Sequence, residues 1–416
     1  MSVRAAGAGR RGRGHPWSRI AVFAGESVAR LSRGLGLGSG SIIGGRVSLV
    51  LDRRALQRTA EGRQIVLVSG TNGKTTTSHM LTNALRVAGA VAHNSSGSNM
   101  ADGALAALMA NPDAAYAVIE TDELHLAQVA DAARPVGIVL LNLTRDQLDR
   151  VAEVRTVAAR IADALDRHTD AFVVANADDP MTVWATRTAR RPVWVAAGMR
   201  WRGESVSCPS CGHALHHEPA GDWWCDCGLR RPDPTWWLSD EYAVGPGVHT
   251  ELSTALPGHV NRANALMALA AATQLEHPPG PAAAAIGSVA DVAGRYAVIT
   301  YDSYTLRLIL AKNPAGWAEA LTMLAPARPL LVAINAKEAD GKDTSWLWDV
   351  AFDQITPRPV AAAGQRSADL GVRLSYADLP HHTDPDPLTA LARLPAGPVD
   401  VLANYTAFHH LHRRLL

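Results

Sequence analysis

A glycine-rich loop between a short apolar run and a helical pattern constrains this chain more than any other feature. Residues 70–76 read Gly-Thr-Asn-Gly-Lys-Thr-Thr, directly after the apolar run Ile65–Val68 and before a helical pattern that extends to about Val87. The backbone N–H groups of such a loop and the N-terminus of the following helix form a cradle for phosphate oxygens. The sequence therefore predicts a nucleotide-binding α/β unit. The predicted phosphate contacts come from Gly70, Thr71, Asn72, Gly73, Lys74, Thr75 and Thr76.

Two side chains of this loop carry the expected chemistry. The ammonium group of Lys74 would neutralise the β- and γ-phosphates, and the hydroxyl of Thr75 would bind Mg²⁺. The loop is a variant, because Val68 stands where the general pattern has its first glycine, so that Gly70 makes the turn. The alternative is a glycine-rich turn that carries Lys-Thr by chance.

Lysine is scarce in this chain, and its use at the loop is therefore informative. Only four of the 40 basic residues are lysines. A lysine in this chain thus indicates a task that arginine cannot perform. The four are Lys74, Lys312, Lys337 and Lys342.

The composition is that of a globular protein with two or three domains. The chain has 416 residues, of which 47% are apolar and 19% charged, and this excludes wholesale disorder. Its 40 basic and 39 acidic residues give a net charge of +1, so no whole-molecule attraction to nucleic acid or anionic membrane is expected. No apolar run is long enough to span a membrane, and Ile20–Ala24 is too short for a signal peptide. We therefore expect a cytoplasmic protein.

Short apolar runs alternate with helical patterns from residue 64 onwards, which is typical of a parallel sheet covered by helices on both faces. After the first run come residues 116–119, 136–141 and 171–175. Ligands of such sheets bind beyond the carboxyl ends of the strands, so the residues at those ends should converge on one site. These residues are Ser69, Gly70, Glu120, Asn142 and Asn176.

The chain divides into three predicted parts. Residues 1–55 are basic and glycine-rich, and they indicate a flexible lead-in or, alternatively, a loop that faces lipid or phosphate. Residues 56–296 form the nucleotide-binding domain, with an inserted module at 200–237. Residues 297–416 form a second α/β domain. Its strand-like runs are Thr305–Leu310, Leu330–Ile334, Val360–Ala363 and Val399–Leu402.

All cysteines of the chain lie in the inserted module. Cys208-Pro-Ser-Cys211 and Cys225-Asp-Cys227 form two pairs, and four thiolates suit tetrahedral Zn²⁺. Such an ion would supply ~10–16 kcal/mol of apparent folding free energy to a small module. Nothing indicates an open coordination position, so the predicted zinc is structural.

Two alternatives to four thiolate ligands remain, because the second cysteine pair is one residue shorter than usual. A histidine could replace one thiolate, or the cysteines could be free thiols. The candidate histidines are His213, His216 and His217. The charge of the module is mixed, so nucleic acid binding is not expected.

The order of the motifs along this chain resembles that of the Mur ligase superfamily, a group of ATP-dependent amide ligases. The matching motifs are residues 70–75, Glu120, 141–149, 176–180, 258–264 and Gly294-Arg295. The resemblance implies that Glu120 binds Mg²⁺, that Asn261 and Asn264 contact adenine, and that Arg295 faces phosphate. A helix-capping acid is the other reading of Glu120.

The chain departs from that superfamily at two places. Gln147 stands where the family often has a histidine. No lysine occurs between Lys74 and Lys312, although many members carry a carbamylated lysine in their central domain. Metal binding at Gln147 and lysine carbamylation are therefore not expected.

The cysteine module and the C-terminal motifs are similar to those of MurT-like members of the superfamily. The C-terminal motifs are Leu310–Gly316, Ala339–Asp349 and Asn404–Ala407. Amino-acid-adding relatives have Asp-x-Ala-His-Asn-Pro where this chain has Ile-Leu-Ala-Lys-Asn-Pro at residues 309–314. The missing acidic residue fits an acceptor other than an amino acid.

The resemblance to MurT-like proteins implies a lipid II isoglutaminyl synthase that pairs with a GatD-type glutamine amidotransferase. The implied reaction uses ATP to activate the α-carboxyl of D-isoglutamate in the lipid II stem peptide, and ammonia from glutamine then gives D-isoglutamine. About 63 residues precede the first strand, whereas relatives that use soluble nucleotides have a full domain there, and this favours a lipid-linked substrate. We expect contact with the inner face of the membrane through this substrate only.

The resemblance also implies that Asp349 completes a Cys-His-Asp triad in the partner. Trp346 and Trp348 would anchor that interface. The alternative is that the tryptophans belong to the core and that Asp349 caps a helix.

Two other functions stay open at this point. An amino acid ligase of the Mur or folylpolyglutamate class predicts ATP turnover that a free amino acid stimulates without a partner. A zinc-ribbon ATP-binding regulator predicts nucleic acid binding that weakens steeply with salt.

Overall fold

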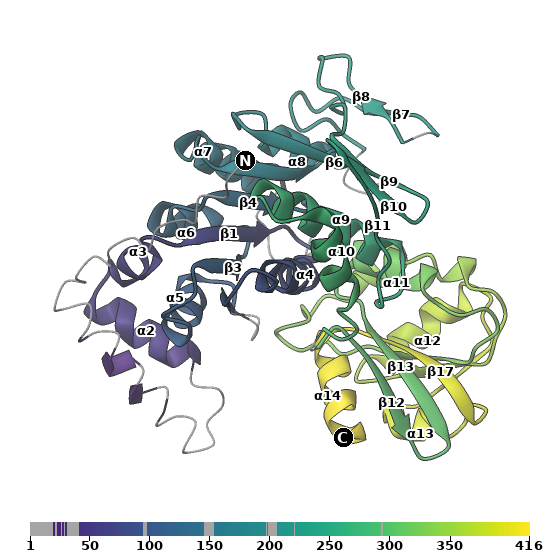
Figure 1. Ribbon diagram of the computed structural model, residues 1–416. Helices are drawn as coiled ribbons and strands as arrows, with labels where there is room; N and C mark the ends of the chain where they lie inside the picture. Colours follow the sequence, from purple (N-terminus) through teal and green to yellow (C-terminus); the bar gives the residue numbers. More distant parts are fainter. Residues whose placement is uncertain are drawn as a thin grey trace.

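The chain folds around two large sheets that lie in separate parts of the molecule (Figure 1). The computed structural model describes residues 20, 23–25, 27–28, 30, 41–94, 98–144, 154–196, 198, 206–219, 221–292 and 294–416. Most of the predicted lead-in, including residues 31–40, lies outside these ranges, and so does Gln147.

The first sheet has nine strands in the described part of the chain, in the order β11-β10-β9-β6-β5-β4-β1-β3-β2. Its parallel strands are β1 (Gln64–Ser69), β2 (Val91–His93), β3 (Tyr116–Glu120), β4 (Gly137–Leu140), β5 (Phe172–Asn176), β6 (Pro192–Ala196) and β9 (Trp236–Ser239). The strands β10 (Tyr242–Gly245) and β11 (Val248–Glu251) extend the β9 edge in antiparallel fashion. Strand order switches sides at β1, and ligands of open α/β sheets bind at such a point.

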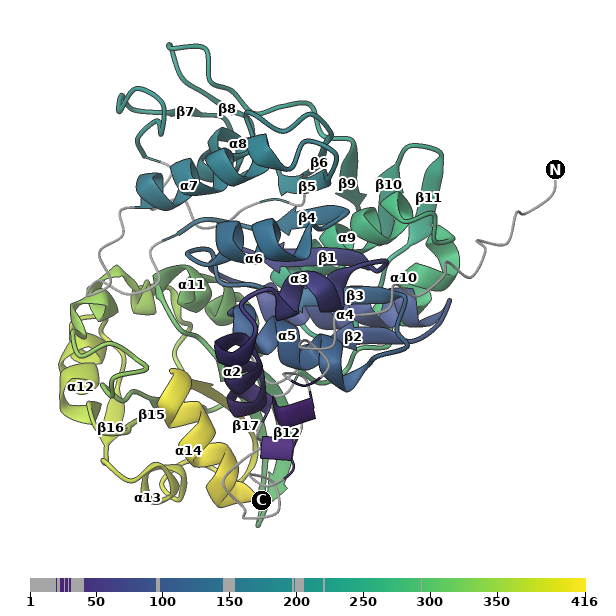
Figure 2. The same ribbon diagram turned by 90° about the vertical axis from the view of Figure 1, so that its left-hand side faces the viewer.

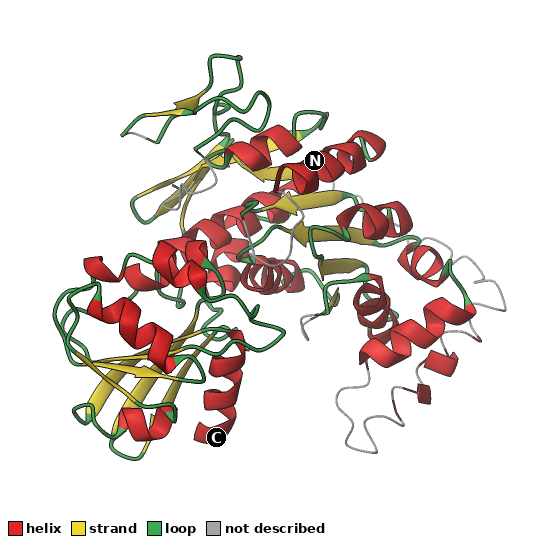
Figure 3. Ribbon diagram, turned by 180° about the vertical axis from the view of Figure 1, so that it is seen from behind, coloured by secondary structure: helices red, strands yellow, loops and turns green. Residues whose placement is uncertain are grey.

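Helices cover both faces of this sheet (Figure 3). On one face Val66 and Val68 pack against α4 (Lys74–Arg86), α9 (His259–Gln274) and α10 (Pro279–Gly287). On the other face Ile65 and Leu67 pack against a second group of helices. This group is α3 (Ala55–Ala60), α5 (Ala101–Ala110), α6 (Leu126–Ala133), α7 (Val154–Arg167) and α8 (Pro180–Ala185). Successive side chains of a strand point to opposite faces, and both faces are buried. These strands therefore read as continuous apolar runs.

The second sheet has the order β12-β13-β17-β14-β15-β16 among the described residues. Its strands are β12 (Tyr296–Tyr301), β13 (Tyr304–Leu310), β14 (Leu330–Ala333), β15 (Val360–Ala363), β16 (His381–Thr383) and β17 (Gly397–Ala403). Within the described residues of this sheet, only the β12–β13 pair is antiparallel. The elements between and after them are α11 (Pro314–Thr322), the 3-10 helices η1 (Ser345–Asp349) and η2 (Phe352–Gln354), α12 (Ser367–Ser375), α13 (Pro387–Leu391) and α14 (Tyr405–Leu415).

The cysteine module adds a small sheet of β7 (His216–His217) and β8 (Trp223–Trp224). In Figure 1 and Figure 2 it lies at one end of the molecule and the second large sheet at the other. The predicted architecture, an α/β domain with a mostly parallel sheet followed by a second α/β domain, is confirmed. The domain boundaries at residues 55, 200–237 and 296 stay predictions.

Part of the predicted lead-in is a packed helix, α2 (Ser41–Leu51). Gly44 and Gly45 are buried, and a Cβ at Gly45 would lie 2.1 Å from the carbonyl oxygen of Asp102 in α5. Glycine thus serves close helix packing here, rather than chain flexibility. Within the described ranges, no helix is long and apolar enough to cross a bilayer.

Candidate functional site

A cleft of about 930 Å³ lies between the two domains, and its walls include the carboxyl ends of strands from both sheets. Strand ends of the first sheet contribute Glu120, Asn142 and Asn176, as the sequence predicts. Other residues of the first domain that line the cleft include 71–76, Asp178, Asn261, Asn264 and Arg295. The second domain contributes Ile309, Lys312, Gly316, Glu319, Tyr405 and His409.

The glycine-rich loop is tied to the end of β4 by Asn142. The backbone N–H of Thr71 donates to the Asn142 carbonyl at 2.8 Å, and that of Asn72 donates to Asn142 Oδ1 at 2.9 Å. Asn142 Nδ2 donates in return to the carbonyl of Asn72 at 3.0 Å. The loop therefore holds its shape through contacts with the neighbouring strand.

Both glycines of the loop have conformations that other residues rarely adopt. Gly70 has φ +133° and Gly73 has φ +85°. A Cβ at Gly73 would lie 2.6 Å from Oδ1 of Asn264, which approaches from α9. The left-handed φ and the buried Asn264 side chain together favour glycine at position 73.

Lys74 is buried beside the loop that it belongs to. Its Nζ donates to the carbonyls of Gly70 at 2.5 Å and Thr71 at 3.2 Å, and it lies 3.2 Å from Oε2 of Glu123. Glu123 is a site residue that our sequence reasoning missed. The sequence feature that could have indicated it is its position three residues after Glu120, in the run Ile-Glu-Thr-Asp-Glu.

Glu120 ends β3 beside this loop, and its backbone is held by Asn94. The Glu120 N–H donates to Asn94 Oδ1, and Asn94 Nδ2 donates to the Glu120 carbonyl, both at 2.8 Å. Among the described residues, its buried Oε2 has no hydrogen-bond partner. The helix-capping alternative is not supported, because the N-cap of the next helix is His125.

The site fits a magnesium nucleotide on the evidence of that buried carboxylate oxygen and the loop geometry. Mg²⁺ takes oxygen ligands, and the candidates here are the Glu120 carboxylate and the Thr75 hydroxyl. The N-terminus of α4 begins at Lys74 and adds its positive dipole end. These residues would hold phosphate groups and their cation.

The predicted adenine pair and phosphate-facing arginine all line the cleft, but their contacts differ. Asn264 reaches the loop at Gly73, whereas Asn261 Nδ2 donates to the Pro257 carbonyl at 2.6 Å. Arg295 Nη2 approaches Thr75 Oγ1 at 3.4 Å. Asn264 and Arg295 therefore contact the loop, and Asn261 is engaged at the start of its own helix.

The second domain brings a histidine that the sequence reasoning missed. His409, on α14, packs against Gly294, where a Cβ would lie 2.7 Å from its Cε1. Burial, and then the nearby charge of Arg295, lower the pKa of His409, so that its ring is neutral at pH 7. The signal was weak, because His409 is one of three histidines in residues 405–415.

Asp349 lies outside the residues that line the cleft and is exposed at the end of η1. The prediction that Trp346 anchors an interface is wrong, because this side chain is buried 5.8 Å from the ring of Trp317. Trp348 is 55% exposed and makes an edge contact with Tyr376. One tryptophan thus belongs to the core and the other to the surface.

The four cysteine sulfur atoms gather at one point, within 4.8 Å of one another. Cys208 Sγ lies 3.6 Å from Cys227 Sγ, and Cys211 Sγ lies 3.4 Å from Cys225 Sγ. A tetrahedral zinc site with Zn–S bonds of about 2.3 Å separates its sulfur atoms by about 3.8 Å, so the cluster fits Zn²⁺. A hydrogen bond from the Leu229 N–H lowers the pKa of Cys227 to about 7, which favours its thiolate near neutral pH.

The proposed histidine ligands do not join this cluster in the described part of the chain. His216 stacks on Trp224 and lies 3.2 Å from Asp226, an arrangement that directs its ring elsewhere. The alternative with a histidine in place of one thiolate is therefore not supported.

The cysteine module is anchored next to the cleft. Arg231 Nε donates to Asp178 Oδ1 at 2.9 Å, and Trp223 Nε1 donates to the Ala177 carbonyl at 3.2 Å. Asp178 lines the cleft and also accepts from the Gly198 N–H at 2.7 Å. Folding of the module is thereby linked to the loop that follows β5.

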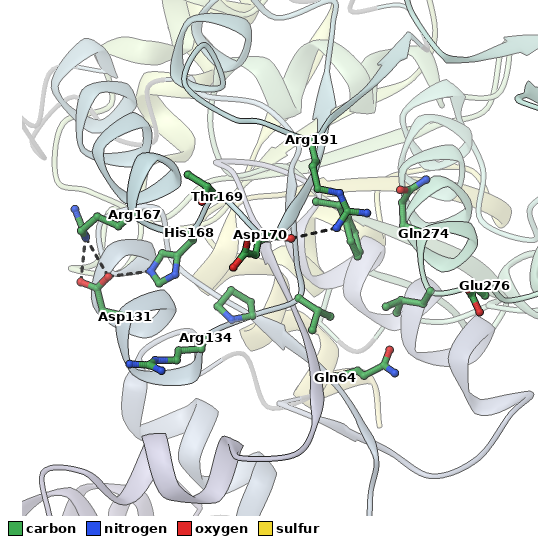
Figure 4. Close-up of a pocket in the computed structure, with 15 residues that line it drawn as sticks. Gln64, Asp131, Arg134, Arg167, His168, Thr169, Asp170, Arg191, Gln274 and Glu276 are labelled. Atoms are coloured by element: carbon green, nitrogen blue, oxygen red, sulfur yellow. Dashed lines mark hydrogen bonds and ion pairs between the residues drawn. The ribbon is translucent and has the colours of Figure 1, made fainter. Parts of the chain in front are cut away.

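Another hollow lies at the opposite ends of the strands, where Gln64 begins β1 (Figure 4). Asp131 contacts Arg167 at 3.0 Å and His168 at 2.9 Å there, and Arg191 donates to the Asp170 carbonyl. Asp131, Arg167 and His168 thus partner one another at the strand ends opposite the loop at 70–76.

Comparison with known proteins places the chain in a family. Residues 68–199 match the Mur ligase middle domain, and residues 310–408 match the MurT ligase C-terminal domain. The chain is 32% identical over 377 residues to the MurT subunit of lipid II isoglutaminyl synthase (glutamine-hydrolyzing) from Streptococcus pneumoniae, covering 83% of this chain and 84% of that protein. It is 29% identical to the subunit of the same name from Staphylococcus aureus, covering 86% and 88%.

A solved structure with the same fold is the pseudomurein peptide ligase type C from Methanothermus fervidus. It aligns with a TM-score of 0.69 at 20% identity, over 84% of this chain and 78% of that one. The match to the Mur ligase middle domain and the similarity to the MurT relatives together show an ATP-dependent ligase of the Mur class. Within that class, the chain belongs to the MurT family.

Substitution of Gly73 tests the nucleotide site. Gly73→Ala should weaken ATP binding at least about tenfold, because the new methyl group is strained at φ +85° and collides with Asn264. The matched control is Gly62→Ala, which has φ +76° and no atom within 4 Å of the added Cβ. Calorimetric titration with ATP measures both variants. Equal affinities would show that the loop does not bind nucleotide.

Removal of the metal tests the cysteine module. The purified chain should contain about one zinc per chain, and Cys225→Ser should lose it, whereas Ser210→Ala should not. The variant should also melt at a lower temperature and bind ATP more weakly, because the unfolded module releases Arg231 from Asp178. Elemental analysis and thermal melting measure these effects. A fully folded chain without zinc would contradict this assignment.

Proposed function

We propose that this chain amidates the α-carboxyl of D-isoglutamate in the lipid II stem peptide, with ammonia from a GatD-type glutamine amidotransferase subunit. One observation carries the proposal: the phosphate loop faces a MurT-type C-terminal domain across a single cleft. The names of the two MurT relatives, which describe glutamine-hydrolyzing lipid II isoglutaminyl synthases, support it. The reaction would take place at the cytoplasmic face of the membrane.

A carboxylate reacts poorly with ammonia, because oxide is too poor a leaving group. The proposed chemistry replaces it with phosphate, which leaves readily. An oxygen of the α-carboxylate attacks the γ-phosphorus of ATP, the bond to the bridging oxygen breaks, and ADP departs. The nitrogen lone pair of ammonia then attacks the acyl carbon, the bond to the phosphate oxygen breaks, and a proton is lost. The products are the amide, ADP and phosphate.

The residues of the cleft have separate tasks in this scheme. The loop N–H groups and Lys74 would hold the phosphates and offset the charge of the transferring group. Mg²⁺, when bound, supplies further charge neutralisation for the phosphates. Arg295 and Asn264 contact the loop and would fix the nucleotide against it. Tight positioning of this kind accounts for most catalysis of phosphoryl transfer.

The acceptor side of the cleft favours ammonia over an amino acid. Ile309 lines the cleft at the position where amino-acid-adding relatives have an aspartate. Its side chain is apolar and almost completely buried, so it offers no partner for the ammonium group of an incoming amino acid. Ammonia needs no such partner.

The surface near Asp349 supports a partner on the second domain. The carboxylate is exposed at the end of η1, beside the exposed ring of Trp348. Tyr376 contacts Trp348 and is also exposed, which gives an aromatic surface of the kind that anchors interfaces. We infer that Asp349 orients the catalytic histidine of the glutaminase.

The decisive experiment is an amidation assay on lipid II. The chain, purified together with its glutaminase subunit, should form the amide with ATP and either glutamine or ammonium, and the chain alone should use only ammonium. Mass spectrometry of the stem peptide, which loses about one mass unit on amidation, provides the measurement. ATP turnover that requires a free amino acid instead would favour the amino acid ligase alternative.

Asp349→Asn separates the two activities. Glutamine hydrolysis by the complex should fall about 10³–10⁴-fold, because an amide cannot orient the histidine as the carboxylate does. Amidation with ammonium should be unchanged, since Asp349 lies outside the cleft. Asp369→Asn, at an exposed acid of α12, is the control and should affect neither activity. Wild-type glutamine turnover in the Asp349 variant would refute the triad.

A further inference from the structure

Helix α2 leaves three large apolar side chains exposed, although its buried face includes small residues. Gly45 and Ser48 are buried against α5, and Leu49 packs in part against the core, whereas Ile43, Val50 and Leu51 are exposed. Val50 is 82% exposed and Leu51 is 58% exposed. A helix at a protein surface normally turns such side chains inward, so this face is built for contact with something else.

Basic residues share the outer face of this helix. Arg46 is three residues after Ile43 and four before Val50, which places all three on one stripe. Arg46 is mostly exposed while contacting Asp102, and Arg53 and Arg54 follow the helix as exposed residues. The combination of exposed apolar and basic side chains is typical of surfaces that lie on membranes.

Positive charge is concentrated in the N-terminal part of the chain, which includes α2. Residues 1–54 contain ten arginines and two acidic residues, a net charge of +8. Since the complete chain has a net charge of +1, residues 55–416 carry −7. An anionic surface would therefore attract this end of the chain and repel the rest, which fixes an orientation.

Two further exposed apolar residues lie next to α2 in the fold. Ile20 and Phe23 are both exposed, and they precede Gly25, where a Cβ would lie 2.5 Å from the Gly44 carbonyl oxygen. On its other side α2 packs on α5, whose N-cap, Met100, lines the cleft. In Figure 1 this part of the molecule lies at the opposite end from β7 and β8.

We infer that this surface docks the chain onto an anionic lipid bilayer. The docking surface comprises Ile20, Phe23, Ile43, Arg46, Val50, Leu51, Arg53 and Arg54. Its apolar side chains would enter the headgroup boundary, and its arginines would pair with lipid phosphates. This direct contact differs from the expectation drawn from the sequence, in which the chain meets the membrane through its substrate only.

The purpose of docking rests on the proposed function, although docking itself does not. Attachment through α2 brings the α5 side of the cleft towards the bilayer surface, where lipid II would present its stem peptide. A nucleic acid partner would explain the arginines but not the exposed Val50 and Leu51, and a second copy of the chain would meet like charge. An anionic bilayer fits both features.

Sedimentation with lipid vesicles tests the docking surface. The full chain should bind vesicles of phosphatidylglycerol and phosphatidylcholine, and binding should weaken with salt and be much weaker to phosphatidylcholine alone. Val50→Glu should weaken binding about tenfold, and Ile43→Glu with Val50→Glu about 100-fold. Val298→Glu is the matched control, because Val298 is 58% exposed on β12, and it should bind as wild type. Thermal melting of each variant checks its folding.

A second variant separates charge from apolar insertion. Arg53→Glu with Arg54→Glu lowers the net charge of residues 1–54 from +8 to +4 and should weaken the salt-dependent part of the binding. The inference is overturned if the wild type does not bind the anionic vesicles, or if the Ile43 and Val50 double variant binds them as wild type does. Binding to RNA in place of vesicles would overturn it as well.

Comparison of two substrates keeps docking distinct from the proposed reaction. The Ile43 and Val50 double variant should amidate a short-chain, water-dispersed lipid II analogue at the wild-type rate, with ammonium. With vesicle-embedded lipid II it should be at least about tenfold slower. Absence of amidation in every sample would refute the proposed function and leave the vesicle result intact. Equal rates on both substrates would refute a role for docking in substrate access.

Discussion

The close approach of Asn264 to Gly73 is the contact on which the rest of the site depends. A side chain at position 73 would displace Asn264, and the positive φ of the turn also favours glycine there. That turn starts α4 at Lys74 and points its N-terminus at the cleft. Asn142 holds the other side of the loop through three hydrogen bonds. The phosphate site is thus shaped before any ligand binds, which lowers the entropic cost of binding.

The second domain completes this site. The phosphate loop lies at the end of the first sheet, and residues of the second domain form the opposite wall of the cleft. His409 packs against Gly294 at the junction between the domains, and Arg295 follows directly with its guanidinium near Thr75. The same short segment therefore contacts both the C-terminal helix and the phosphate loop. Neutral His409 beside Arg295 also avoids a repulsion that a charged ring would create there.

Local sequence signals predicted a large part of this structure. The apolar runs of both sheets, the loop at 70–76 and the cysteine pairs all depend on neighbours in the chain, and each was readable as a pattern. Glu123 and His409 were missed, since their roles arise from contacts with residues that are distant or unremarkable in sequence. Trp346 and Trp348 illustrate the limit most clearly. They are two residues apart, yet one is buried and one exposed, because η1 turns them to different sides.

Glycine was the residue type most easily misread. The pair at 44–45 suggested a flexible lead-in, whereas in the fold it lets α2 approach the backbone of α5. A helix that packs through glycine can leave large side chains such as Ile43, Val50 and Leu51 exposed, and these remain available to a lipid surface. The consequence extends to the cleft. Water competes with ammonia for an acyl phosphate, so the reaction proposed here gains from apolar residues in the cleft, among them Leu256, Ile309 and Met323. Apolar side chains are therefore buried where water must be excluded and exposed where a lipid surface can replace it.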